Sequence, residues 1–347
     1  MIFHLTSLCW HLANVCLVYR FFIMLLSKSN VYIEYNIRII AFFTALLWGI
    51  HPVNVESVAW LSASKVLIYT FFYLLSLLCY LKYVQNRRNT YFLLTLFFFI
   101  CSFLGKEQAV TLPVCLLLID YFVGRDFHNR ELWVEKISFF SLSLLGGILT
   151  ILSQGSEGEE LIYSLDYRIL FACYTTFEYM VKSFLPVNLS YIYPFPVLPE
   201  ESIPLRLWFY PIIVLTGSGM LFVYRKNKIV MFSILFLVLH VAVALHLISI
   251  SRFTIVADRY LYLGCIGTSF LTVWIFFHFI QALSEKWKRL LISACFALYL
   301  IYLGTYCFSY TKDWKDTDTL KSHVRKLIKN RENSSPLKKH GEPFNNN

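Results

Sequence analysis

The sequence predicts an all-α membrane protein, a polytopic transmembrane bundle of about ten spanning helices. Three observations lead to this prediction. Of the 347 residues, 58% are hydrophobic and only 15% are charged. The mean hydropathy is +0.59. The apolar residues gather in long runs with short polar loops between them. A soluble globule of this length cannot bury so much apolar surface, so lipid must solvate most of it.

The spanning helices are predicted from apolar runs, because a span needs about 20 mostly apolar residues. Ten runs approach or reach this length: residues 2–26, 37–50, 66–83, 91–104, 109–122, 137–152, 207–224, 229–250, 261–280 and 290–308. Several are short, and one contains Pro113. Short or broken helices are tolerated at membrane depth where they face protein or a watery cavity.

One further helical segment, residues 170–185, is predicted to lie on the membrane surface. It carries Glu178 and Lys182 one helical turn apart, which suits an interfacial helix better than a lipid-facing span. No sequence break divides residues 1–309, which we expect to form one bundle. Residues 310–347 are a polar, basic tail, which we expect to be the start of a truncated soluble region.

The formal net charge of +10 does not indicate nucleic-acid binding, because the basic residues lie mainly in the tail and in loops between apolar runs. One alternate set of loops carries fourteen Lys and Arg residues, and the other carries seven. Cytoplasmic loops of membrane proteins are enriched in Lys and Arg, so the first set is predicted to be cytoplasmic. The second set is predicted to lie outside.

The predicted outer loops place ionisable residues directly against helix ends. The candidate site residues are His51, Glu56, Lys106, Glu107, Arg252, Asp258 and Arg259, with Tyr193 in a Tyr-Pro-Phe-Pro loop. Ionisable groups near membrane depth are costly, and they are usually paired or functional. The chain has no metal-ligand spacing, no Gly-rich phosphate loop and no G-x-S-x-G motif, so we expect no metal and no other cofactor.

Structural interpretations of these residues remain open. Lys106 with Glu107, and Asp258 with Arg259, are alternatively ion pairs at helix ends that only fix the topology. His51 precedes Pro52, which favours a helix stop. Glu56 lies near the next helix start, where its charge suits the helix dipole.

Three stretches resemble a known family: His-Pro-Val-Asn-Val-Glu-Ser-Val-Ala-Trp at 51–60, Leu-Gly-Lys-Glu-Gln-Ala-Val-Thr-Leu-Pro at 104–113, and Ala-Asp-Arg-Tyr-Leu-Tyr-Leu at 257–263. The family is that of membrane glycosyltransferases with C-terminal tetratricopeptide repeats. It includes the eukaryotic transmembrane and tetratricopeptide-repeat O-mannosyltransferases and bacterial relatives. Residues 3–6, 193–196 and 314–316 also fit, in the same order. Ser57 and Trp60 resemble the bacterial members.

The resemblance implies a C-superfamily glycosyltransferase that takes a sugar from a polyprenyl-phosphate donor on the outer membrane face. The acceptor would be a hydroxyl of a protein or glycan. Lys106, Arg252 or Arg259 would hold the donor phosphate, and His51, Glu107, Asp258 and Tyr193 would complete the binding site. A carboxylate would act as general base.

Two departures from the family affect the expected activity. The family's acidic pair lies in a loop upstream of the helix that matches residues 2–26, and its repeats follow Trp314; this chain contains neither. Glu56 is the strongest catalytic substitute within the chain. The alternative expectation is that the chain is an inactive fragment. A second hypothesis is a non-catalytic membrane protein that binds a lipid carrier or assembles a glycan or envelope complex.

A transporter is less favoured, because the charged residues gather at one surface and not at the bilayer midplane. The expected location is a bacterial inner membrane, or the endoplasmic reticulum membrane if the source is eukaryotic.

Overall fold

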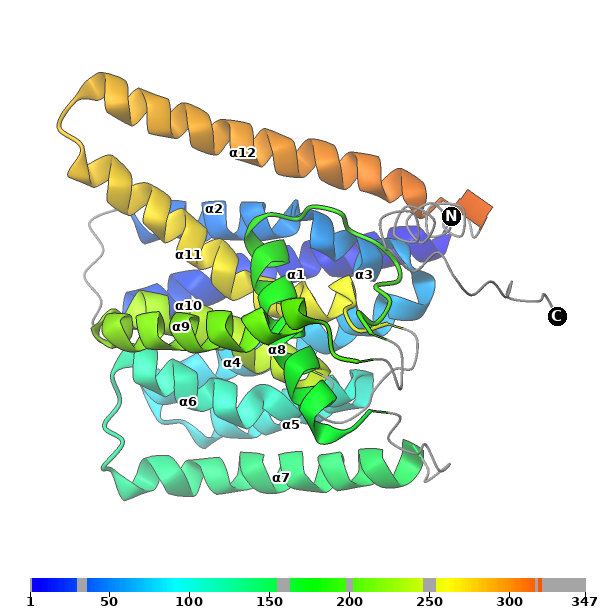
Figure 1. The fold of residues 1–347 in the computed structure, drawn as a ribbon. Coiled ribbons are helices and arrows are strands. Elements are labelled where there is room, and N and C mark those ends of the chain that lie inside the picture. The colour runs from blue at the N-terminus through cyan, green and yellow to red at the C-terminus, as the bar shows by residue number, and fades with distance from the viewer. Residues whose placement is uncertain are drawn as a thin grey trace.

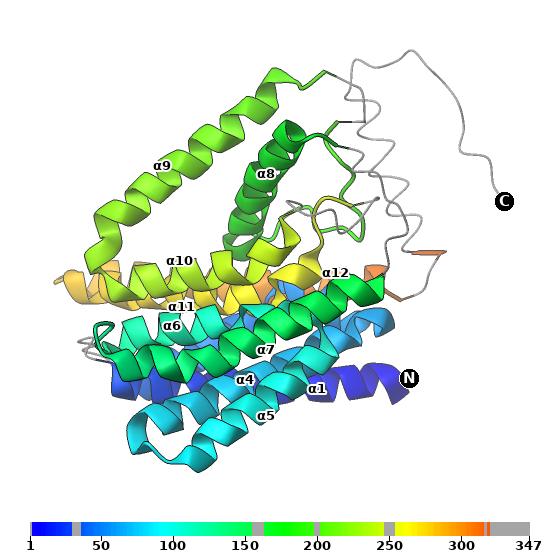
Figure 2. The ribbon, with the colours of Figure 1, turned by 90° about the horizontal axis from the view of Figure 1, so that it is seen from below.

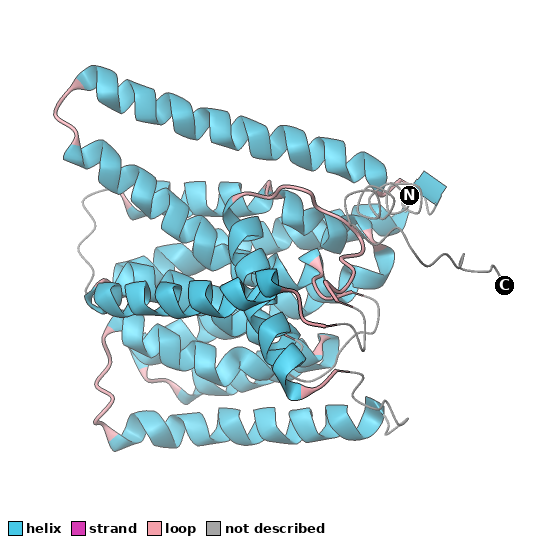
Figure 3. Ribbon diagram, in the orientation of Figure 1, coloured by secondary structure: helices cyan, strands magenta, loops and turns pink. Residues whose placement is uncertain are grey.

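The computed structural model describes residues 2–29, 36–154, 163–197, 202–245, 254–315 and 318–319. Within these ranges the chain consists of α-helices, short 3-10 helices and connecting loops (Figure 3). The β pairing described there is one isolated bridge, between Tyr193 and Val256. The all-α prediction is therefore confirmed.

The helices follow the predicted apolar runs closely. They are α1 (Ile2–Lys28), α2 (Ile37–Gly49), α3 (Val55–Ala59), α4 (Ser64–Asn86), α5 (Asn89–Gly105), α6 (Leu112–Val123), α7 (Arg130–Gln154), α8 (Leu165–Phe184), α9 (Phe209–Val223), α10 (Lys228–Val241), α11 (Leu261–Ala282) and α12 (Lys286–Asp313). Short 3-10 helices precede α3, α6, α9 and α11, at Pro52–Asn54, Glu107–Thr111, Leu205–Trp208 and Asp258–Tyr260.

The expected count of about ten spans is not confirmed. Among the described residues, six helical segments are long and apolar enough to cross a membrane: α1, α4, α7, α9, α11 and α12. The 3-10 turns that adjoin α4, α9 and α11 belong to these segments, so that α9 lies in a segment of 22 residues, Leu205–Lys226. The count becomes seven if α2 and the segment Pro52–Ala59, bent by 54°, form one broken span. The other predicted spans are too short, because α5, α6 and α10 have 17, 12 and 14 residues.

The helices sort into a packed interior and a periphery that faces lipid. Helix α11 is almost wholly buried along its first half, whereas α9 has no buried residue. Large apolar side chains such as Leu152 on α7, Leu215 on α9 and Leu298 on α12 are exposed on the outside of the bundle. Figure 2 shows α9 diverging from α10 on one side of the bundle. This distribution is expected when lipid, and not water, covers the periphery.

The bundle has two ends, which carry different polar groups. The connections α4–α5, α6–α7, α9–α10 and α11–α12 lie together at one end, here called the α6–α7 end (left in Figure 1). At the opposite end, the α3 end, lie α3, the start of α4 and the C-terminal end of α12. Four connections predicted to be cytoplasmic are thus at the α6–α7 end, and the segment between α2 and α4, predicted to lie outside, is at the α3 end (Figure 1).

The predicted surface helix is α8. It pairs Glu178 with Lys182 at 3.3 Å and does not meet the length and composition criteria for a span. The proposed boundary after residue 309 stays a prediction, because α12 continues to Asp313 and residues 320–347 lie outside the described part of the chain.

Candidate functional site

The first part of the site is the bend after α2. The His51 ring accepts a hydrogen bond through Nδ1 from the backbone N–H of Val53 (3.4 Å), and the Asn54 amide donates to the carbonyl of Trp48 (2.6 Å). Pro52 starts the 3-10 turn without needing a backbone donor. His51 therefore caps this turn, as the structural interpretation expects, and the bend turns Glu56 into the protein interior.

Glu56 and Arg259 form the central ion pair of the site. Arg259 donates from its guanidinium (2.6 Å) and from its backbone N–H (2.8 Å), one bond to each carboxylate oxygen of Glu56. The Glu56 side chain is fully buried, and that of Arg259 is 20% exposed. A carboxylate in this position needs such a partner, because burying an unpaired charge is very costly.

Asp258 is the second buried carboxylate, and it pairs with a neutral group. The Tyr193 hydroxyl donates to Asp258 at 2.8 Å from one carboxylate oxygen and lies 3.1 Å from the other. The backbone of Ile255 donates to the carbonyl of Tyr193 (2.8 Å), which fastens this loop to the segment before α11. Burial and the charge of Asp258 raise the pKa of Tyr193 well above its ordinary value. Asp258 and Arg259 thus bond to different partners, and not to each other as the structural alternative expects.

Lys106 is a buried cation at the same end. Gly105 ends α5 against the backbone of Tyr69, where a Cβ atom would lie 3.1 Å from the Tyr69 Cα. The next residue turns to extended backbone, and the Lys106 ammonium lies 4.7 Å from the centre of the Tyr260 ring. Burial lowers the pKa of Lys106 to about 7; Glu107 and Glu56 oppose the fall, and Arg259 adds to it.

Sequence reasoning missed one residue of the site as a functional candidate. Lys182, read from the sequence only as half of a surface ion pair, places its ammonium 4.6 Å from the centre of the Tyr193 ring and is only 5% exposed. It is near enough to interact with the charge of Asp258. The feature of the sequence that could have indicated this role is the position of Lys182 on the apolar face of an amphipathic helix.

The structure therefore brings together most of the predicted residues, from four separate segments. His51, Glu56, Lys106, Tyr193, Asp258 and Arg259 are at the α3 end, with Glu107 beside Lys106. Arg252 lies outside the described residues. Four rings, here called the aromatic cluster, border the charged groups: Trp60, Tyr191, Tyr310 and Trp314.

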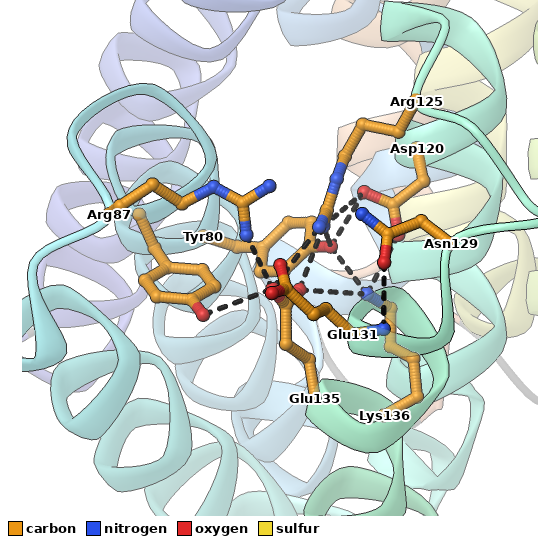
Figure 4. Close-up of polar contacts among 9 residues, drawn as sticks. Tyr80, Arg87, Asp120, Arg125, Asn129, Glu131, Glu135 and Lys136 are labelled. Atoms are coloured by element: carbon orange, nitrogen blue, oxygen red, sulfur yellow. Dashed lines mark hydrogen bonds and ion pairs between the residues drawn. The ribbon is translucent and has the colours of Figure 1, made fainter.

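A second polar network occupies the α6–α7 end and was not predicted (Figure 4). Asp120 pairs with Lys136 (2.7 Å) and Arg125 (3.2 Å), and Arg125 also pairs with Glu135 (2.9 Å). The Tyr80 hydroxyl donates to Asp120 (2.6 Å). Burial acts to lower the pKa of Arg125, but the hydrogen bond and charge of Glu135, together with Asp120, raise it. Each buried charge here has an opposite partner, so the network joins α4, α6 and α7.

The fold and the site together define a multi-pass α-helical membrane protein with buried acidic and basic groups at both ends of the bundle. Comparison with known proteins adds a distant similarity. The chain is 31% identical to protein O-mannosyl-transferase TMTC2 of Mus musculus over 155 residues, which cover 43% of this chain and 18% of the relative. It is 34% identical to the tmtc2 protein of Xenopus laevis over 111 residues, covering 29% and 13%.

A third relative is protein O-mannosyl-transferase F38B6.6 of Caenorhabditis elegans, 28% identical over 160 residues, which cover 44% of this chain and 22% of the relative. The chain thus spans less than a quarter of the length of each of these relatives in the matched region. No family model and no solved structure matches the chain.

Proposed function

We propose that the chain is the core of a membrane glycosyltransferase, acting at the α3 end on the outer membrane face. Its donor is a sugar on a polyprenyl-phosphate carrier, and its acceptor is a hydroxyl of a protein or glycan. The observation that carries the proposal is the convergence of two buried carboxylates, Glu56 and Asp258, with the buried cations Lys106 and Lys182 and with Arg259. The relatives named above are O-mannosyl-transferases, so mannose is the first sugar to test.

The cations suit the leaving group of this reaction. An apolar carrier would lie in lipid with its phosphate at headgroup level. Arg259 is already bonded to Glu56, and Lys182 to Glu178. Lys106 faces the Tyr260 ring and is therefore the cation we assign to the phosphate. Its charge would stabilise the polyprenyl phosphate as the bond from the sugar to the phosphate oxygen breaks.

The contacts favour Asp258 over Glu56 as the general base. Both oxygens of Glu56 accept bonds from Arg259, whereas Asp258 accepts only from the neutral Tyr193 hydroxyl among the contacts described. Hydrogen bonds to a charged donor stabilise the ionised carboxylate and weaken it as a base. In the proposed step, Asp258 takes the acceptor's hydroxyl proton as the acceptor oxygen attacks the anomeric carbon. Glu56, predicted from the sequence as the catalytic residue, then orients Arg259.

The second candidate function is carrier binding without transfer. The pairing of Glu56 favours it, because the carboxylate predicted from the sequence as the catalytic residue has both oxygens bonded to Arg259. In both functions the chain works in a lipid bilayer. The bacterial inner membrane stays a prediction, since the relatives named above are animal proteins.

Transfer of labelled mannose from polyprenyl phosphate to a serine- and threonine-containing peptide tests the proposal. The purified chain and a version extended by any coding sequence upstream of Met1 are reconstituted in liposomes. Transfer by either version supports the glycosyltransferase. Specific binding of polyprenyl phosphate with no transfer by either version supports the second candidate, and neither binding nor transfer contradicts both.

A further inference from the structure

The aromatic cluster is built from three segments far apart in the sequence. Trp60 follows α3, Tyr191 lies in the loop after α8, and Tyr310 and Trp314 lie at the end of α12. The ring centres of Trp60 and Tyr191 are 5.4 Å apart, and those of Tyr191 and Trp314 are 5.8 Å apart, both edge to face. Trp60 and Tyr191 are only half-buried, so their side of the cluster is accessible from outside the bundle, whereas Tyr310 and Trp314 are buried behind them.

Two hydrogen-bonding groups in this cluster have no partner among the described residues. They are the indole Nε1 of Trp314 and the hydroxyl of Tyr310. Trp314 is 8% exposed and Tyr310 is 3% exposed. Buried tryptophan N–H and tyrosine O–H groups usually have a partner, because an unsatisfied buried donor costs free energy. The two groups therefore point to a ligand that accepts hydrogen bonds.

The cluster adjoins the charged part of the site. The Arg259 guanidinium lies 5.3 Å from the centre of the Trp60 ring while it is bonded to Glu56. The charges of Asp258 and Glu56 act on the Tyr310 hydroxyl. A ligand held by the rings would therefore lie beside the carboxylate to which we assign the proton transfer.

The chemistry of the cluster selects among ligand classes. A purely apolar ligand would leave the Trp314 and Tyr310 donors unpaired. A quaternary ammonium ligand would compete with Arg259, which already occupies the Trp60 ring. A pyranose ring has an apolar face of C–H groups for aromatic rings and hydroxyl oxygens that accept hydrogen bonds.

We propose that Trp60, Tyr191, Tyr310 and Trp314 form a subsite that binds the sugar ring of the substrate, with the Trp314 indole and Tyr310 hydroxyl bonded to sugar oxygens. This inference rests on the proposed function for the location of the reaction, and it adds the residues that recognise the sugar.

The test compares two lipids that differ only in the sugar: polyprenyl-phosphate mannose and bare polyprenyl phosphate. Their binding to the full chain in lipid nanodiscs is measured for the wild type, for a variant with both Trp314→Phe and Tyr310→Phe, and for Trp287→Phe. The double variant keeps an aromatic ring at each position and removes the indole N–H and the phenol O–H, together with the five-membered ring of the Trp314 indole. Trp287 is the matched control, since it lies at the other end of α12 and is 61% exposed.

We expect the wild type and the control to prefer the sugar-bearing lipid. The double variant should lose about tenfold of that preference, as expected for two hydrogen bonds, while it binds the bare lipid as before. Tyr310→Phe alone removes only the hydroxyl, and its thermal stability without ligand should not fall, because that hydroxyl has no partner among the described residues. A clear fall in that stability would overturn the proposal.

Two further outcomes separate this inference from the proposed function. If the wild type binds both lipids equally, or the double variant keeps the full preference, the sugar subsite is wrong, whatever the transfer assay gives. If the preference is lost as expected while no transfer is found, the subsite stands and the assigned transfer reaction does not.

Discussion

Asp258 and Glu56 are both fully buried carboxylates, and their different partners predict different consequences of substitution. Asp258→Asn keeps the shape and a hydrogen-bond acceptor for Tyr193 but cannot take a proton. We expect the transfer rate to fall about 100-fold or more, with sugar-lipid binding retained. The measurement is single-turnover transfer of labelled mannose. An unchanged rate would remove Asp258 from the role of base.

Glu56→Gln should act first on stability. It leaves the Arg259 guanidinium, 20% exposed, without its carboxylate. Breaking a buried ion pair from one side costs about 3–5 kcal/mol, and solvent access reduces this to about 2 kcal/mol here. Thermal unfolding in detergent, followed by circular dichroism, measures the loss. A variant as stable as the wild type would show that the pair does not hold α3 to the start of α11.

Lys106 should make carrier binding depend on pH. With a pKa of about 7, it loses its charge as pH rises through neutrality, so affinity for polyprenyl phosphate should fall between about pH 6 and 8. In the unfolded chain a lysine stays protonated up to about pH 10. The folded chain thus binds fewer protons between these values, and this group's contribution to stability rises with pH across that window.

The matched variant for this pH dependence is Lys106→Met, which removes the ammonium group and keeps most of the length of the side chain. It should bind the carrier weakly at every pH and show a flat profile. A wild-type profile that stays flat between about pH 6 and 8 would contradict the assignment of Lys106 to the phosphate.

At the scale of elements, the positions of helices were predictable and their pairings were not. Long apolar runs give α1, α4, α11 and α12 to within a few residues. The ion pair of Glu56 and Arg259 joins residues 203 positions apart. The pattern of residues around each of them does not predict that they pair. Asp120 was missed because it is a single acid within an apolar run, and its cation, Lys136, belongs to the next helix.

In the network at the α6–α7 end, we expect substitution of a buried residue to lower the free energy of unfolding more than substitution of an exposed one. Asp120→Asn would leave the buried Lys136 and Arg125 with reduced neutralisation, and we expect a loss of about 3 kcal/mol. Arg87→Ala removes a partner that is 47% exposed, and we expect less than about 1 kcal/mol. Unfolding of both variants in detergent measures the difference. Equal losses would mean that Asp120 does not anchor α7.

For the whole molecule, the sequence predicted the fold class and which loops share an end, because hydropathy and charge alternate along the chain. The number of spans is not confirmed, because a hydropathic run does not show where helices as short as α5, α6 and α10 begin and end.

The orientation of the bundle can be tested with single cysteines. The nine native cysteines are unpaired and are first replaced by serine or alanine. Asp126→Cys, in the α6–α7 connection, should react with a membrane-impermeant maleimide only after the membrane is opened. Asn188→Cys, in the loop that leads from α8 to Tyr191, should react in intact cells. The reverse pattern would place the candidate site on the cytoplasmic side.

The central claim is that the α3 end, and not the α6–α7 end, holds the carrier phosphate. A polyprenyl phosphate with a diazirine on its first isoprene unit, crosslinked to the reconstituted protein and mapped by mass spectrometry, tests it most directly. We expect crosslinks in the peptides around Lys106, Tyr193 and Asp258, reduced by Lys106→Met. Crosslinks confined to the surroundings of Arg87 and Arg130, where a cavity of about 570 Å³ lies beside the second network, would contradict the account.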